Sequence, residues 1–121
     1  MGPGLSRAWL SVQPSMSSIS IDNLPVREIF PGIRARLVHS ARTSQSWVEI
    51  DEGVSFPEHH HPHEQTVNVL EGTLELVVDG ETHVLSAGQS FVIAPDVRHA
   101  GRARTACRVL DVFAPVREDY R

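Results

Sequence analysis

Residues 53–72 read GVSFPEHHHPHEQTVNVLEG, and this stretch decides how the rest of the chain is interpreted. Four of the seven histidines fall within it, ahead of a segment in which apolar and polar residues alternate. If the segment is extended, His59, His61 and Gln65 point to the same face as the valines that follow, because side chains alternate along a strand. Imidazoles and an amide oxygen beside an apolar lining predict a buried metal site.

Short β-rich runs separated by turn residues lie on both sides of this stretch. We expect strands at 34–39, 46–50, 66–70, 73–78, 82–85, 91–94 and 107–113. The pair Asp79-Gly80 is a strong hairpin signal, and no segment has a convincing helical stripe. Many short strands at short intervals predict an all-β sandwich or barrel.

The chain has 121 residues, which fits one domain. Residues 1–20 are rich in Gly, Pro and Ser and have no periodicity, so we expect a flexible N-terminal arm followed by a domain over residues 21–121. The arm lacks the apolar core of a signal peptide, which favours a cytoplasmic protein.

Composition excludes several classes of function. The net charge of -4 argues against nucleic-acid binding, and no apolar run is long enough to cross a membrane. A single cysteine, Cys107, rules out a disulfide framework. All eleven basic residues are arginine, which excludes Schiff-base chemistry on a lysine. Any carboxylate or phosphate group of a ligand would therefore be bound by arginine guanidinium groups.

The expected last strand, 107–113, alternates between two sets of residues, and one set contains both Asp111 and Phe113. If this set faces inward, Asp111 is a carboxylate in an apolar interior and needs a cation or hydrogen bonds nearby. The other set is also apolar, at Leu110 and Val112. The pattern therefore leaves open whether Asp111 lies inside or on the surface.

Residues 53–72 resemble the first conserved motif of the cupin superfamily. The matching positions are Gly53, His59, His61, Gln65 and Gly72, with Gln65 in place of the usual acidic ligand. A second motif keeps its histidine, His99, but carries Ala94 and Asp96 where the family has proline and glycine.

The resemblance extends over residues 33 to 117 and implies a small jelly-roll barrel. It also implies that one divalent metal ion is bound by His59, His61, Gln65 and His99. Imidazole and amide ligands suit zinc, nickel, iron or manganese. Four protein ligands leave a coordination position for a substrate when the metal is five- or six-coordinate.

Three segments, HHHPHEQ, VLEG and LDVFAPVREDY, resemble the KdgF family of pectin and alginate breakdown. That family linearises 4,5-unsaturated monouronates to 4-deoxy-5-keto-uronates. The resemblance implies that Asp111 is a general acid–base, that Phe113 packs against the sugar and that Arg117 clamps the uronate carboxylate. It further implies a small acidic carbohydrate as substrate and a homodimer.

Three other functions fit the same residues. A metal-dependent dioxygenase would need a redox metal and would consume oxygen. A different isomerase or cyclase could use the same ligand set without redox chemistry. A cupin that binds a sugar or metabolite without converting it would need no acid–base residue, and the fold does not choose among the three.

Overall fold

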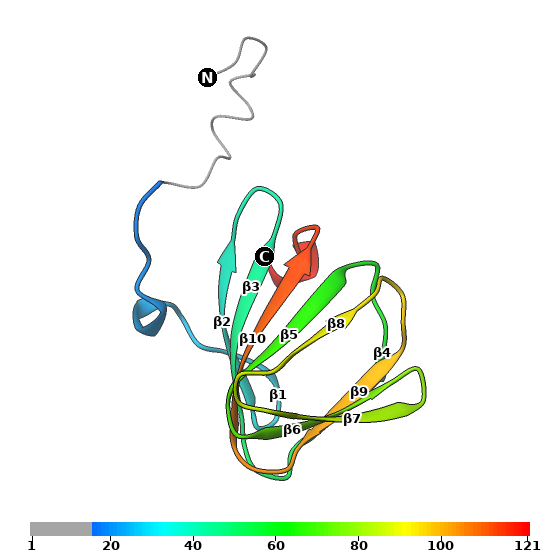
Figure 1. Cartoon of the computed structure of the whole chain (residues 1–121). Helices are drawn as coiled ribbons and strands as arrows, with labels where there is room; N and C mark the ends of the chain where they lie inside the picture. Colours follow the sequence, from blue (N-terminus) through cyan, green and yellow to red (C-terminus); the bar gives the residue numbers. More distant parts are fainter. Residues whose placement is uncertain (1–15) are drawn as a thin grey trace.

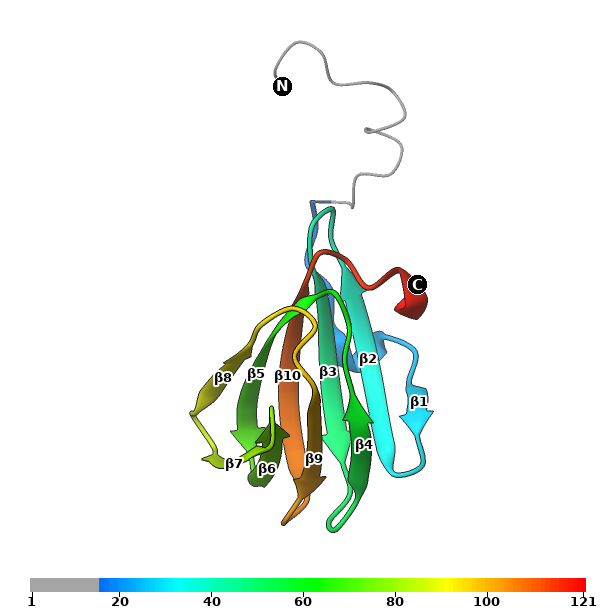
Figure 2. The ribbon, with the colours of Figure 1, turned by 90° about the vertical axis from the view of Figure 1, so that its right-hand side faces the viewer.

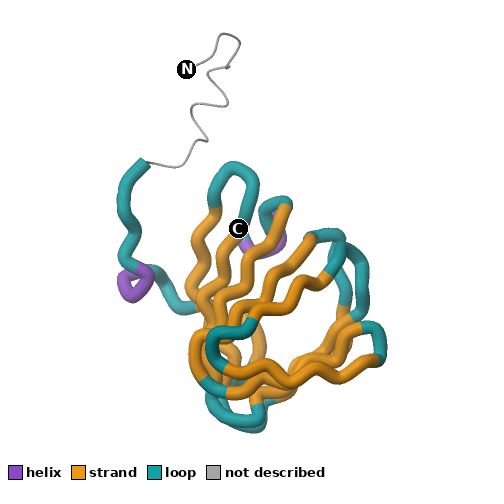
Figure 3. The backbone as a smooth tube through the Cα atoms, viewed as in Figure 1, coloured by secondary structure: helices purple, strands orange, loops and turns teal. Residues whose placement is uncertain are grey.

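The computed structural model describes residues 16–121, so most of the predicted arm, residues 1–15, lies outside the described residues. Strands make up most of the described chain (Figure 3). They are β1 (Arg27–Phe30), β2 (Ile33–His39), β3 (Ser44–Ile50), β4 (Ser55–His59), β5 (Glu64–Glu71), β6 (Thr73–Val78), β7 (Glu81–Ser86), β8 (Ser90–Ile93), β9 (His99–Ala103) and β10 (Cys107–Ala114). Two short 3₁₀ turns cover Ile21–Asn23 and Glu118–Tyr120. Within residues 16–121, no helix has the length and hydropathy needed to span a membrane.

The strands form two antiparallel sheets that face one another (Figures 1 and 2). One sheet has the order β1-β2-β3-β10-β5-β8, and the other has the order β4-β9-β6-β7. The predicted all-β jelly roll is confirmed. Its barrel is not closed by strand pairing, because no ladder joins the two sheets in the described part of the chain.

The core lies between the sheets and follows the alternation of the sequence. Buried and less buried residues alternate regularly along β3, β5 and β6. On β10, Cys107, Val109 and Phe113 are buried, as expected if this set faces inward. The aliphatic residues of both sheets thus meet in one cluster, as expected when each sheet buries one face.

Three strands were not predicted, namely β1, β4 and β9. No strand was expected between 46–50 and 66–70, but β4 begins at Ser55 and contains Pro57. Proline lacks an N–H donor and is tolerated at sheet edges and bulges. β4 is the edge of its sheet, and its pairing with β9 is irregular between Phe56 and His59, so Pro57 fits there.

Gly72 joins β5 to β6 with a φ of 87°. A Cβ at this position would collide with the backbone carbonyl oxygen of Ala106. Gly80 has a φ of 78°, but a Cβ there would meet no atom within 4 Å.

We expect Gly72→Ala to lower the free energy of unfolding by more than the about 1–2 kcal/mol that positive φ alone costs an alanine. Gly80→Ala should show only that smaller loss in urea unfolding, and equal losses would contradict the predicted collision.

Candidate metal centre and cavity

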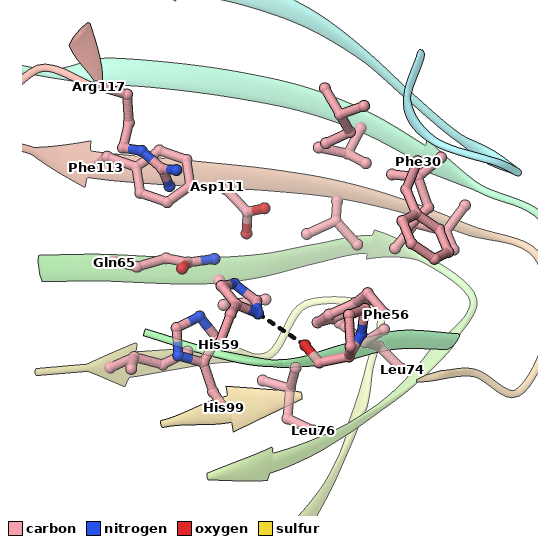
Figure 4. Close-up of a pocket in the computed structure, with 18 of the residues that line it drawn as sticks. Phe30, Phe56, His59, Gln65, Leu74, Leu76, His99, Asp111, Phe113 and Arg117 are labelled. Carbon is pink, nitrogen blue, oxygen red and sulfur yellow. Dashed lines mark hydrogen bonds between the residues drawn. The ribbon is translucent and has the colours of Figure 1, made fainter. Parts of the chain in front are cut away.

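Strand pairing brings two of the predicted histidines together. His59 ends β4 and pairs directly with His99, which begins β9. His61 follows in the loop before β5, and its ring centroid lies 5.0 Å from that of His99. The ligand nitrogens of the three histidines all lie within 4.8 Å of one another. Figure 4 shows His59 and His99 close together at one end of a pocket.

Each of these histidines is held in the same tautomer. The Nδ1 atom donates to a backbone carbonyl at 2.9 Å from His59 to Pro57, at 3.0 Å from His61 to His63 and at 2.8 Å from His99 to Val97. A carbonyl only accepts, so Nδ1 carries the hydrogen and Nε2 of the neutral ring keeps its lone pair. Metal-binding histidines are oriented by this type of contact.

Burial favours the neutral form of the His61 and His99 rings. It lowers the pKa of His61, and the charge of Arg117 acts in the same direction. Burial also lowers the pKa of His99 to about 4. The Nε2 atom of His99 is buried and has no hydrogen-bond partner among residues 16–121. An unpaired buried acceptor is costly, so this atom favours a ligand that accepts its lone pair.

Gln65 completes the set from the inward face of β5, where only 8% of its surface is exposed. Its Oε1 lies 3.0 Å from His61 Nε2. Both atoms are acceptors when the His61 hydrogen is on Nδ1, so a cation between them would relieve their repulsion. Three imidazole nitrogens and one amide oxygen therefore fit a borderline divalent metal.

Asp111 faces the interior, which resolves the orientation that the sequence left open. It lies on β10 between β3 and β5 and lines the cavity beside the histidines (Figure 4). Burial raises the pKa of Asp111 to about 7, against the opposing effects of a hydrogen bond from Gln65 and the charge of Arg117. Asp111 Oδ1 has no hydrogen-bond partner within the described chain.

Arg117 is buried at the same end of the cavity, but its guanidinium is already engaged. Nε and Nη2 donate to the two carboxylate oxygens of Asp119 at 3.0 and 2.7 Å. The guanidinium carbon lies 4.7 Å from the ring centre of Phe113 and 4.1 Å from that of Tyr120. Asp119 thus occupies the Nε–Nη2 edge of the guanidinium, so a bidentate clamp on a substrate carboxylate would have to use the other N–H donors.

Sequence reasoning missed Asp119 and Tyr120. Both belong to the C-terminal 3₁₀ turn, and Tyr120 lines the cavity. Arg27 of β1 holds this turn by donating from Nη1 to the Tyr120 carbonyl at 2.7 Å. The available signal was the spacing of Arg117 and Asp119 in the REDY ending, which places opposite charges two residues apart.

The cavity has a volume of about 280 Å³ and two chemically different ends. The polar end contains His59, Gln65, His99, Asp111, Arg117 and Tyr120. The other end is apolar and includes Phe30, Phe56, Leu74 and Leu76. Figure 4 shows Phe30, Phe56 and Leu74 on the side of the pocket away from Gln65 and Arg117.

Comparison with known proteins agrees with this architecture. Residues 46–113 match the family model described as "Cupin domain". The chain is 28% identical over 102 residues to "Pectin degradation protein KdgF" of Dickeya dadantii, which covers 82% of this chain and 93% of that protein. The structure of KdgF from Halomonas sp. is 27% identical, with a TM-score of 0.83, and the match covers 88% of this chain and all of that one.

A shorter match is found to "Polyketide synthase CurC" of Streptomyces cyaneus. It is 47% identical over 51 residues, which is 41% of this chain and 33% of CurC. The chain therefore spans only a third of this relative. The family model covers more than half of the chain, and the chain belongs to the cupin family, in which it resembles the small protein KdgF.

Proposed function

We propose that this protein is a metal-dependent enzyme that linearises 4,5-unsaturated monouronates to 4-deoxy-5-keto-uronates. The observation that carries the proposal is the half-buried residue Asp111 beside three convergent histidines, because its Oδ1 is buried and its pKa is raised to about 7. A carboxyl group in this range can both donate and accept a proton at neutral pH. Similarity to proteins named KdgF supports the choice of substrate.

His59, His61, Gln65 and His99 would hold the metal, which when bound supplies a Lewis acid for a substrate oxygen. Asp111 would accept the proton of the C1 hydroxyl as the bond between C1 and the ring oxygen breaks. It would then deliver that proton to C4 as the enolate at C5 becomes a ketone. No atom is gained or lost, so the reaction needs no oxidant or second substrate.

Arg117 would bind the uronate carboxylate through the N–H donors that Asp119 does not occupy. The rings of Phe113 and Tyr120 stack on the guanidinium and would keep it in place. Phe113 would also pack against the sugar and exclude water. The proposal also includes a homodimer, which the family resemblance implies. It includes a cytoplasmic location as well, which the composition of the N-terminal arm favours.

An ultraviolet assay on unsaturated monouronates from pectin and alginate tests the reaction. Loss of the C4–C5 double-bond absorbance should be accelerated by metal-loaded protein, should cease after chelation and should return when one equivalent of a divalent metal is added. Fully loaded protein without acceleration would refute the proposed reaction. Oxygen consumption measured alongside would point instead to a dioxygenase.

A further inference from the structure

The apolar end of the cavity is not used by the proposed reaction. Phe30 of β1, Phe56 of β4, and Leu74 and Leu76 of β6 lie there, away from Arg117 (Figure 4). We call this end the apolar chamber. Other hydrocarbon side chains also line the cavity, at Ile29, Ile33, Val48, Ile50 and Val109.

No named side chain of the apolar chamber carries a hydrogen-bonding group. A substrate hydroxyl placed there would lose its contacts with water and gain none from these side chains, which weakens binding by roughly tenfold or more. A hydrocarbon group would instead leave water, and each buried methylene strengthens binding by about fourfold. The chamber therefore discriminates strongly between hydroxylated and hydrocarbon groups.

The wall of the chamber is fixed by packing against the backbone. Gly101 of β9 is buried, and a Cβ at that position would collide with the ring of Phe56. Phe56 and Gly101 are directly paired across β4 and β9. The ring of Phe56 therefore packs against the β9 backbone at Gly101. Leu74 and Leu76 are each 1% exposed, so their side chains are held by the core.

We propose that the apolar chamber is a subsite for a hydrocarbon group of the substrate. An amphipathic carboxylic acid would then bind with its carboxylate at the Arg117 end and an alkyl, alkenyl or aryl group among Phe30, Phe56 and Leu76, whereas the monouronate of the proposed reaction would occupy the polar end alone. This inference rests on the proposed function in one respect, the placement of the carboxylate at the polar end.

A series of simple acids tests the subsite without turnover. Zn²⁺-loaded protein would be titrated with acetate, butyrate, hexanoate and 6-hydroxyhexanoate, and binding followed by methyl NMR of Leu74 and Leu76. Affinity should rise about fourfold per methylene from butyrate to hexanoate. The terminal hydroxyl of 6-hydroxyhexanoate should reduce affinity at least about tenfold relative to hexanoate. Equal affinities for these two acids, or no dependence on chain length, would overturn the proposal.

A matched pair of variants locates the binding. Leu76→Phe fills the chamber and should weaken hexanoate at least about tenfold while acetate binding is unchanged. Val84→Phe enlarges a residue of the same sheet that is 44% exposed, and should leave both acids unaffected. If Leu76→Phe does not fold, the acid series on the unaltered protein decides the question by itself.

The uronate assay separates this inference from the proposed function. Uronate turnover together with equal binding of hexanoate and 6-hydroxyhexanoate would overturn the subsite and leave the reaction intact. A steep dependence on chain length without uronate turnover would refute the reaction and support the subsite.

Discussion

Asp111→Asn should lower kcat on unsaturated monouronates by about 100- to 10,000-fold, the usual contribution of a general acid–base. Asparagine has nearly the same shape but cannot transfer a proton. The residue is not among the proposed metal ligands, so metal content should remain at the wild-type level. Ultraviolet kinetics and metal analysis on the same sample measure both quantities, and retained turnover would remove Asp111 from the mechanism.

The same substitution should stabilise the metal-free protein. Burial raises the pKa of Asp111 from its ordinary value of 3.8 to about 7, so the folded protein binds this proton more tightly than the unfolded chain. The resulting penalty on folding is absent well below pH 3.8, grows as the pH rises to about 7 and is complete above it. At pH 8 we expect Asp111→Asn to raise the free energy of unfolding by about 2 kcal/mol.

Comparison at two pH values isolates this effect. The difference between Asp111→Asn and the unaltered protein should be much larger at pH 8 than at pH 4, because other titrating groups cancel in the difference. Asp79→Asn is a suitable control, since Asp79 is exposed and has a φ of 49° that asparagine tolerates. A loss of stability in Asp111→Asn at pH 8 would mean that the carboxylate is well paired in the folded protein.

A stabilising substitution that abolishes activity is expected where a functional group is buried at a cost to the fold. Under the proposed mechanism Asp111 fits this description, because its buried Oδ1 is unpaired among the described residues. The inward orientation of the Asp111 side chain could not be predicted from the sequence. β10 carries apolar residues on both faces, and Leu110 and Val112 on the outer face are themselves partly buried. Its alternation therefore identifies a central strand without identifying the inner face.

The convergence of His59, His61 and His99 was predictable from motif spacing, but extended geometry alone does not produce it. We expected one extended segment to align His59, His61 and Gln65. The structure instead has two strands of different sheets, with His61 in the loop between them. Alternation holds within β5, where Gln65 and Val67 face inward. The approach of His59 depends on its pairing with β9, which is a long-range contact that local patterns do not encode.

The contacts of Arg117 also depend on tertiary structure. Its position near the site followed from family resemblance, but its pairing with Asp119 and its stacking on Tyr120 require the C-terminal turn to fold back. That turn is held by Arg27, which precedes it by more than 90 residues. The family resemblance therefore pointed to a residue that lines the cavity, but the sequence could not show that Asp119 and Tyr120 contact its guanidinium.

His99→Ala should remove metal binding and, with it, both activity and metal-dependent stability. His99 is 2% exposed and supplies a lone pair that no other described residue contacts. Loss of this nitrogen should weaken metal affinity by more than the about 10- to 100-fold that loss of a supporting contact costs. At a metal concentration of 100 times its Kd, the unaltered protein gains about 2.7 kcal/mol of stability, and the variant should gain almost none.

His60→Ala provides the matched control, because His60 belongs to the same histidine cluster but is exposed and lies outside the group of convergent nitrogens. Thermal unfolding with and without metal should give the full stabilisation for His60→Ala and for the unaltered protein. Comparing metal-free samples separates the cost of the cavity left by the imidazole from the loss of the metal. If His99→Ala were stabilised by metal as strongly as the control, the ion would have to bind through other residues, and the orphaned Nε2 would need a different partner.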